Sequence, residues 1–277
     1  MKFSLGSEWN ELKKFEDLKQ NERDVVFYSE NENSMLIFKS LISELTNKHN
    51  LNICYVTSSK DESILKKPNN KIKSFFIGDG VVRTKFFLNL KAKILIMTMP
   101  DLETFHIKKS KVYPVHYVYL FHSMVSTHLI YRRSAFEHFD SIFCVGNYQL
   151  DEIRSTEKLY DLKPKNLIRY GYSHLDNLLE KYSKRILLPK NNENKLHILL
   201  APSWSDDGLF ENISEKVIDI LLREGYKVTF RPHPMTQKKS KKKIDRMTEK
   251  FSKNESFLLE QNISNFDSFL FSDIMIT

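Results

Sequence analysis

The stretch YKVTFRPHP, residues 226–234, is an apolar run that ends in two prolines interleaved with an arginine and a histidine. Each proline lacks a backbone N–H and holds the residue before it extended, which is typical of a strand that stops at the edge of its sheet. Because alternate side chains of an extended chain share a face, we expect Arg231 and His233 to point the same way as a cationic pair. The alternative is a rigid turn with a solvated arginine.

Similar apolar runs recur along the chain. They are DVVFYS (24–29), NICYVT (52–57), SFFIG (74–78), KILIMT (93–98), HYVYLF (116–121), SIFCVG (141–146), LIRYG (167–171), LHILLA (196–201), YKVTF (226–230) and DIMIT (273–277). Helical patterns lie between most of them, at 34–45, 147–159, 176–182 and 213–223, and a capping box of Asn212 and Glu215 precedes the last. Alternating helices and nearly continuous apolar strands predict an α/β protein with doubly wound parallel sheets.

A polar, asparagine-rich break, PKNNENK, separates two series of strands. It predicts two Rossmann-like domains joined by a hinge. The predicted ranges are an N-terminal helical extension at 1–23, a domain at 24–188, the hinge at 189–195 and a second domain at 196–277. A complete doubly wound domain needs roughly 100 residues or more, and the last run ends inside a strand pattern, so we expect the second domain to be incomplete.

The composition favours a globular protein with an anionic partner. Hydrophobic residues make up 41% of the 277, and the net charge of +8 suits nucleotides, polyphosphates, nucleic acids or lipid headgroups. Cys54 and Cys144 lie in apolar runs without metal-site spacing, which predicts buried thiols in a reducing compartment and no disulfide. The start of the chain lacks the apolar core of a signal peptide. The run KKSKKK (238–243) is typical of a solvated helix face, and an anionic membrane surface is the alternative partner.

The candidate site residues follow the predicted strands, because ligands of open parallel sheets bind beyond the carboxyl ends of the strands. The chain has neither a G-x-x-x-x-G-K loop nor a G-x-G-x-x-G fingerprint. No D-x-D motif follows a strand, so we expect no metal. The candidates lie at four strand ends: His122, Ser123 and Ser126; Gly171, at a sharp turn; Ser203, Trp204 and Ser205; and Arg231 with His233. A buried structural histidine and hydroxyls that cap helices are the alternatives.

Several segments taken in order resemble the CDP-glycerol glycerophosphotransferase family, whose enzymes build teichoic-acid and capsule polymers. The segments are FYSEN, LFHSMVSTHLIYRRSAFEHFDSIFCVG, GYSHLDNL, LLAPSWSDDGLFEN, RPHP and SDIMIT. The resemblance implies the GT-B fold, in which the C-terminal domain holds the nucleotide donor. It also implies that His122 is the base on the acceptor hydroxyl and that His233 contacts the donor phosphates.

The resemblance further implies a CDP-linked polyol as donor substrate, no separate cofactor, and a polymer or lipid-linked acceptor. It implies a cytoplasmic enzyme that is peripheral at the inner face of the membrane and binds no nucleic acid. We then expect Arg231, Ser203, Trp204, Ser205 and Gly171 on the donor side, Ser123 and Ser126 on the acceptor side, and both histidines in one interdomain cleft. Two alternatives remain: a GT-B glycosyltransferase or sugar-nucleotide epimerase, and a non-catalytic homologue that binds anions or membranes.

Overall fold

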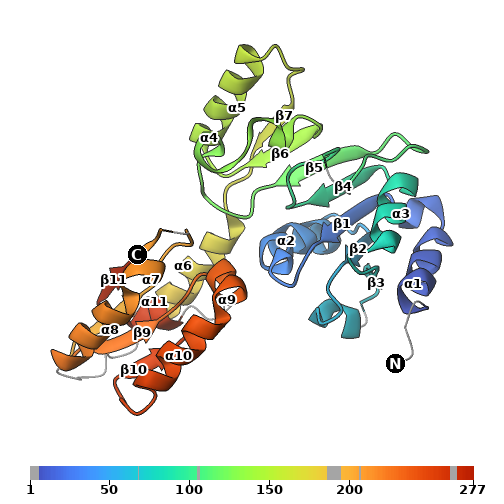
Figure 1. Cartoon of the computed structure of the whole chain (residues 1–277). Coiled ribbons are helices and arrows are strands. Elements are labelled where there is room, and N and C mark those ends of the chain that lie inside the picture. The colour runs from blue at the N-terminus through green and yellow to red at the C-terminus, as the bar shows by residue number, and fades with distance from the viewer. Residues whose placement is uncertain (1–5, 68, 105–106, 186–194, 206, 263–266) are drawn as a thin grey trace. The chain divides into compact units, whose positions relative to one another are not determined.

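The computed structural model of the chain describes residues 6–67, 69–104, 107–185, 195–205, 207–262 and 267–277. These residues divide into two compact units, an N-terminal unit, Met1–Asn177, and a C-terminal unit, Leu178–Thr277. Each unit is built on its own parallel sheet, so the predicted α/β class is confirmed (Figure 1). The boundary falls within helix α6 (Ser173–Arg185), ahead of the predicted hinge, of which residues 189–194 lie outside the described residues.

The N-terminal unit contains a seven-stranded sheet in the order β3-β2-β1-β4-β5-β6-β7. Every pairing in it is parallel, and Phe27 of the central strand faces Tyr55 on one side and Ile96 on the other. The strands are β1 (Val25–Ser29), β2 (Ile53–Thr57), β3 (Ile72–Phe76), β4 (Ile94–Met97), β5 (His116–Leu120), β6 (Ser141–Cys144) and β7 (Asn166–Arg169). Each lies on a run that the sequence predicts.

Both faces of this sheet are buried. Along β1, Val26 and Tyr28 belong to one hydrophobic cluster and Phe27 belongs to another, as the two-residue period of a strand requires. One cluster includes residues of α1 (Ser7–Glu16), α3 (Val81–Asn89) and α5 (Asn147–Leu159), and the other includes residues of α2 (Ser34–Ser43) (Figure 1). The remaining elements are α4 (Thr127–Ile130), the π-helix η2 (Glu44–Lys48) and the 3-10 helices η1 (Gln20–Glu22), η3 (Ser63–Lys66) and η4 (Arg133–Phe136).

The helix α1 lies in the segment 1–23, which the sequence predicts as an extension, and it contributes to the core of the N-terminal unit. Its residues Leu12 and Phe15 are 1% and 2% exposed. The ring of Phe15 meets Phe75 and Phe86 edge to face, with centroid distances of 5.5 and 5.3 Å. Such aromatic pairs stabilise a core beyond the burial of their area, so α1 is an integral part of this unit.

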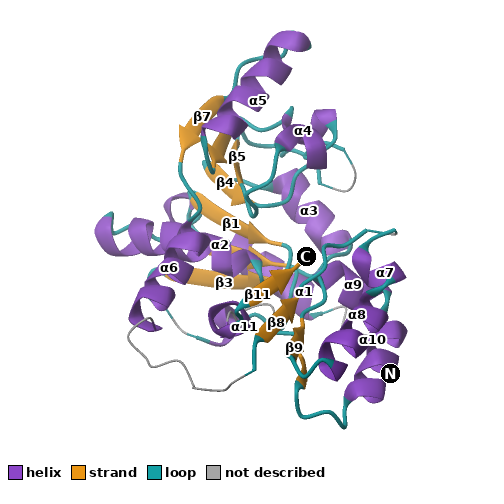
Figure 2. Cartoon of the chain, turned by 90° about the vertical axis from the view of Figure 1, so that its left-hand side faces the viewer, coloured by secondary structure: helices purple, strands orange, loops and turns teal. Residues whose placement is uncertain are grey.

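The C-terminal unit contains a four-stranded parallel sheet in the order β10-β9-β8-β11, of which Figure 2 labels β9, β8 and β11. Its strands are β8 (His197–Leu200), β9 (Lys227–Phe230), β10 (Phe257–Leu259) and β11 (Ile274–Ile276). Its helices, besides α6, are α7 (Leu209–Asn212), α8 (Ser214–Arg223), α9 (Pro234–Lys239), α10 (Lys241–Phe251) and α11 (Asp267–Phe271). A core cluster that includes Phe210, Ile218, Phe230 and Met247 joins β8 and β9 to α7, α8 and α10.

The C-terminal unit differs from the sequence analysis in two respects, a strand that was missed and a capping box that is absent. The sequence analysis missed β10, which is only three residues long and half-exposed, so its apolar pattern is weak. The predicted capping box of α8 is also absent, because Ile213 occupies the N-cap position and no side chain caps the helix there. Glu215 instead forms ion pairs with Lys250 and Arg246, at 2.8 and 3.5 Å.

Both cysteines are buried and free, as the sequence predicts. Burial raises the pKa of each thiol to about 12, so both are protonated at neutral pH. They behave as small core side chains on β2 and β6.

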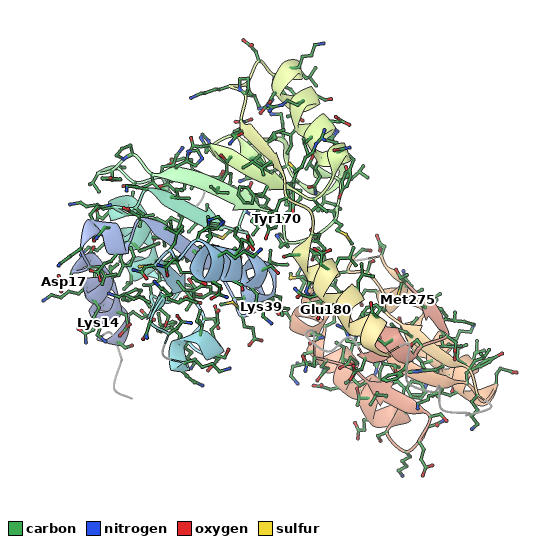
Figure 3. The ribbon with its side chains drawn as sticks, turned by 180° about the vertical axis from the view of Figure 1, so that it is seen from behind. Lys14, Asp17, Lys39, Tyr170, Glu180 and Met275 are labelled. Atoms are coloured by element: carbon green, nitrogen blue, oxygen red, sulfur yellow. The ribbon has the colours of Figure 1, made fainter. Side chains whose placement is uncertain are left out.

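The turn after β7 depends on Gly171, which has a φ of +85°. Its N–H and that of Tyr170 both donate to the carbonyl of Cys144, at 3.2 and 3.0 Å. The ring of Tyr170 packs on that of Phe143, with a distance of 5.2 Å between the ring centroids. Figure 3 labels Tyr170 where the chain leaves the sheet. The prediction of a sharp turn at this glycine is therefore confirmed.

We expect Gly171→Ala to lower the free energy of unfolding of the N-terminal unit by about 1–2 kcal/mol, because an L side chain is strained at positive φ. For a domain of this size each kcal/mol lowers the melting temperature by about 2–4 °C, which calorimetry can measure. Gly6→Ala is the matched control, since Gly6 has a φ of −93° and open space around it. Equal melting temperatures of the two variants would contradict the role assigned to this turn.

Candidate active site

The strand order of the N-terminal sheet defines one topological switch point. The chain runs from β1 outward to β3, then returns to the other side of β1 and runs from β4 to β7. Ligands of such sheets bind at the carboxyl ends of the two strands where the direction changes, which here are β1 and β4. Glu30 directly follows β1, and Thr98 directly follows β4. The next strand, β5, is followed by Phe121 and His122.

The side chain of His122 is hydrogen-bonded at this switch point. Its Nδ1 lies 3.1 Å from the carbonyl oxygen of Thr98. A carbonyl oxygen can only accept, so Nδ1 carries the proton and the lone pair of the neutral ring is on Nε2. Partial desolvation lowers the pKa of His122, while the Thr98 carbonyl and the charge of Glu30 act in the opposite direction. The ring is therefore neutral at physiological pH and can accept a proton at Nε2.

The backbone of His122 is held by a residue that the sequence analysis did not select. The hydroxyl of Tyr172 donates to the His122 carbonyl oxygen at 2.9 Å. Tyr172 directly follows Gly171, so the turn at that glycine presents the tyrosine to the loop after β5. No periodicity in the sequence signals this contact across 50 residues. In this structure Gly171 belongs to the N-terminal unit, and its predicted donor-binding role stays a prediction.

The two serines after His122 differ in their surroundings. Ser126 caps α4 by accepting from the N–H of Leu129 at 3.3 Å, and its hydroxyl donates to Glu152 at 2.6 Å. These bonds are those of a helix cap, the alternative that the sequence analysis left open. Ser123 is half-buried in the loop that follows β5. An acceptor-side role of either serine stays a prediction.

In the C-terminal unit, a cavity of about 180 Å³ lies at the carboxyl ends of β8 and β9. It brings together three of the predicted donor-side residues, Ser203, Arg231 and His233. Pro232 and Pro234 also line it. Trp204 and Ser205 are not among its lining residues. Trp204 is 41% exposed, and the ammonium of Lys239 lies 4.3 Å from the centre of its indole.

Arg231 is largely buried and carries a compensating partner, which the sequence analysis did not anticipate. Its Nη1 lies 3.9 Å from a carboxylate oxygen of Glu260, and its guanidinium lies 4.8 Å from the ring centre of Phe269. The same nitrogen donates to the hydroxyl of Ser268 at 3.3 Å. Burial lowers the pKa of Arg231 and Glu260 raises it, but a guanidinium stays charged in either case. Glu260 follows the missed strand β10, so its proximity to Arg231 could not be predicted.

The ring of His233 has the opposite tautomer to that of His122. Its Nδ1 accepts from the N–H of Met235 at 3.1 Å, which caps α9. An N–H group can only donate, so the lone pair is on Nδ1 and the neutral ring carries its proton on Nε2. Partial desolvation lowers the pKa of His233 and favours this neutral form. His233 thus offers a hydrogen-bond donor, whereas His122 offers an acceptor.

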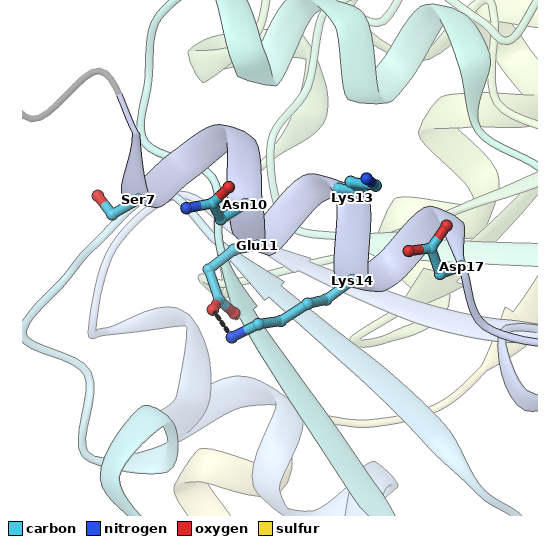
Figure 4. Close-up of a pocket in the computed structure, with 6 residues that line it drawn as sticks. All are labelled: Ser7, Asn10, Glu11, Lys13, Lys14 and Asp17. Carbon is cyan, nitrogen blue, oxygen red and sulfur yellow. Dashed lines mark hydrogen bonds and ion pairs between the residues drawn. The ribbon is translucent and has the colours of Figure 1, made fainter.

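The hollow over helix α1 fits a site less well than the cavity at β8 and β9. This hollow, of about 450 Å³, is lined only by residues of that helix and its C-cap, namely Ser7, Asn10, Glu11, Lys13, Lys14 and Asp17 (Figure 4). Glu11 and Lys14 form an ion pair at 2.6 Å there, as on any solvated helix face. Across the described ranges, no three His, Cys, Asp or Glu side chains cluster as metal ligands would. None of the helices described combines the length and the apolarity needed to cross a bilayer.

Comparison with solved structures shows the fold. The wall teichoic acid polymerase TagF, in a structure soaked with CDPG, matches with a TM-score of 0.56 and 13% identity, over 97% of this chain and 69% of that chain. The UDP-GlcNAc 2-epimerase of Neisseria meningitidis, bound to UDP-GlcNAc, matches with a TM-score of 0.59 and 13% identity, over 91% and 76%. The UDP-GlcNAc 2-epimerase of Methanocaldococcus jannaschii, in complex with UDP-GlcNAc and UDP, matches with a TM-score of 0.53 and 13% identity, over 88% of this chain and 75% of that chain.

These likenesses confirm the predicted GT-B fold. No curated protein matches the sequence. The family model described as CDP-Glycerol:Poly(glycerophosphate) glycerophosphotransferase matches residues 12–277. The resemblance seen in the sequence is thereby confirmed, and the chain belongs to the CDP-glycerol:poly(glycerophosphate) glycerophosphotransferase family.

Proposed function

We propose that this protein transfers a polyol phosphate from a CDP-linked donor, such as CDP-glycerol, to an acceptor hydroxyl during the synthesis of a cell-surface polymer. The observation that carries the proposal is the pair of opposite tautomers, in which His122 offers a lone pair and His233 offers an N–H. In phosphoryl transfer to a hydroxyl, a base that takes the hydroxyl proton and a donor that binds the phosphate oxygens both stabilise the transition state. The family and the TagF structure with CDPG support the class of donor.

In this mechanism Nε2 of His122 takes the proton of the acceptor hydroxyl. The oxygen attacks the β-phosphorus of the donor, and a new P–O bond forms to the acceptor. The bond between the β-phosphorus and the oxygen that bridges the two phosphates breaks, so CMP leaves with the electron pair. The histidine then returns its proton to solvent. Thr98 and Tyr172 keep the ring and its backbone in position throughout.

On the donor side, phosphoryl transfer depends on positioning and charge neutralisation more than on covalent chemistry. Arg231 supplies a fixed positive charge, and the carboxylate of Glu260 with the ring of Phe269 restricts the orientations of its guanidinium. His233 donates from Nε2, and Ser203 adds a hydroxyl in the same cavity. We propose that no separate cofactor takes part.

A second candidate function is suggested by the likeness to UDP-GlcNAc 2-epimerases, with a TM-score of 0.59 for the Neisseria meningitidis protein. In that case the same cavity would hold a UDP-sugar. We favour the transferase because the family model covers residues 12–277.

We further propose that the acceptor is a polymer or a lipid-linked molecule at the inner face of the membrane.

A donor screen separates the two functions. We expect the full-length protein to release CMP from CDP-glycerol or CDP-ribitol when an acceptor polymer is present, and to leave UDP-GlcNAc unchanged. Chromatography of the nucleotides measures both reactions. Conversion of UDP-GlcNAc without CMP release would reject the transferase, and donor binding without any turnover would identify a non-catalytic homologue.

Replacement of the proposed base tests the acceptor side. We expect His122→Ala to lower kcat by about 10²–10⁴, because general base catalysis contributes a factor of that size. His49→Ala is a matched control, since His49 is exposed and precedes β2, at the opposite edge of the sheet. If steady-state CMP release gives the same kcat for both variants, His122 is not the base.

The pH dependence follows from the lowered pKa of His122. The base works only when neutral, so activity is lost as the pH falls through the pKa of this ring. Because desolvation lowers that pKa, we expect the acid limb of the kcat/KM profile to have its midpoint below 6.5, the ordinary value for histidine. The profile of the His49→Ala variant should be the same. A midpoint above the ordinary value would contradict this assignment.

A further inference from the structure

A second cavity of the N-terminal unit has a volume of about 290 Å³ and lies between the segment of α4 and η4 and the end of α5. Three cationic side chains line it, Arg132, Arg133 and Lys165, together with the carboxylates of Glu137 and Glu157. Its other walls include the rings of Tyr131, Phe136 and Tyr160. Pockets of about this size with aromatic walls and a few charged groups are typical of small-molecule sites.

Lys165 is the most unusual of these residues, because its side chain is only 6% exposed. Its ammonium lies 3.9 Å from a carboxylate oxygen of Glu157, which is too far for a hydrogen bond. Within the described ranges no hydrogen bond of this ammonium is found. Burial of a charged group without hydrogen bonds is unfavourable, so an anion in the cavity would stabilise it.

The backbone of Lys165 is fixed by its neighbours. Its N–H donates to Glu157 at 2.8 Å, and its carbonyl accepts from Arg154 at 2.9 Å. Arg154 also donates to Glu157 at 2.5 Å. The carboxylate of Glu157 is therefore already satisfied by Arg154 and a backbone amide, which leaves the ammonium of Lys165 available to a ligand.

Arg133 provides a second cation at the rim of the cavity. Its side chain is 60% exposed, and its guanidinium lies 4.5 Å from the ring centre of Tyr160. Its nearest carboxylate in the described part of the chain is that of Glu137, at 4.0 Å, beyond hydrogen-bonding distance. Arg132 is less available, because it is paired with Asp101 at 2.5 Å. Arg133 and Lys165 are thus the two cations that an anionic ligand would engage.

The cavity is close to the proposed base. The hydroxyl of Tyr119 lies 3.5 Å from Nδ1 of His122 and donates to the hydroxyl of Tyr131 at 3.3 Å. Tyr131 lines the cavity, so two side-chain contacts separate it from the histidine. Tyr119 itself is buried, so these contacts establish that the cavity and the histidine are close and do not form an open channel between them.

We propose that this cavity binds the phosphodiester of the acceptor, so that Arg133 and Lys165 hold the anionic unit behind the reacting hydroxyl. The assignment rests on the proposed function, because it takes the acceptor to be a polyol phosphate chain. A phosphodiester joins an anion to a flexible polyol. The cations match the anion, and the tyrosine rings and hydroxyls match the polyol.

Binding of a synthetic glycerol phosphodiester dimer to the donor-free, full-length protein tests the assignment by calorimetry. We expect Arg133→Gln to raise the dissociation constant about 10-fold or more, because it removes a charge-assisted hydrogen bond. Arg223→Gln is the matched control for charge, since Arg223 is exposed on α8 and paired with Asp219; its affinity should equal that of the wild type.

Lys165→Met distinguishes a binding role from a structural one. The variant keeps the aliphatic stem, and Glu157 keeps its bond to Arg154, so the melting temperature should not fall. Binding of the dimer should weaken as for Arg133→Gln. A large fall in melting temperature with unchanged affinity would show that the lysine is structural and would overturn the assignment.

Three further outcomes decide the proposal. In turnover, Arg133→Gln should raise the KM for the acceptor and leave kcat and the KM for CDP-glycerol unchanged. Equal affinity of wild type and Arg133→Gln for the dimer, or binding of inorganic phosphate as tight as that of the dimer, would overturn the assignment. Binding that depends on Arg133 in a protein that releases no CMP would support the phosphodiester site and reject the proposed reaction instead.

Discussion

Every strand of each sheet runs parallel to its neighbours, and the rest of the structure depends on this constraint. Parallel strands cannot be joined by tight turns, so each must be followed by a crossover that covers a face of the sheet. The apolar runs are therefore nearly continuous, and both faces of β1 are buried. The same constraint brings the carboxyl ends of all strands of one sheet to the same side, where the chain leaves the buried sheet and polar residues can be placed.

That edge is where the candidate chemistry of each unit lies. In the N-terminal unit it holds His122 against the end of β4, and in the C-terminal unit it holds Arg231 and His233 beside the end of β8. The backbone decides what each histidine can do. A carbonyl group at Nδ1 makes His122 an acceptor at Nε2, and an amide at Nδ1 makes His233 a donor at Nε2. Lowered pKa values keep both rings neutral, so each keeps its role at physiological pH.

Each unit contains a largely buried cation, and the two cations differ in their hydrogen-bond and ion-pair partners. Arg231 is accompanied by Glu260, Ser268 and Phe269, which fix its direction. Lys165 has Glu157 nearby, but that carboxylate is already bonded to Arg154. The first arrangement is a preorganised charge with a partner of its own. In the second, the ammonium of Lys165 makes no hydrogen bond within the described part of the structure, and we therefore propose it as a binding group.

The strand-end candidates illustrate how far a sequence pattern reaches. His122, Ser203, Arg231 and His233 could be selected because each lies within three residues after an apolar run, and the structure puts the last three around one cavity. Tyr172 could not, because its contact with His122 spans 50 residues and depends on the turn at Gly171. Glu260 was missed together with β10, whose three half-exposed residues give too weak a pattern. Ser126 matches the same pattern as the others, yet its hydroxyl is occupied by capping α4.

The sequence by itself determined the α/β class, ten of the strands described and the edges at which polar residues gather, because hydrophobic periodicity and proline placement act over a few neighbouring residues. The ordered set of motifs determined the family. Only the tertiary structure decided the tautomers of the two histidines, the partner of Arg231 and the cavity around Lys165. These depend on atoms brought together from distant segments, and no local pattern encodes which backbone carbonyl or amide a side chain will meet.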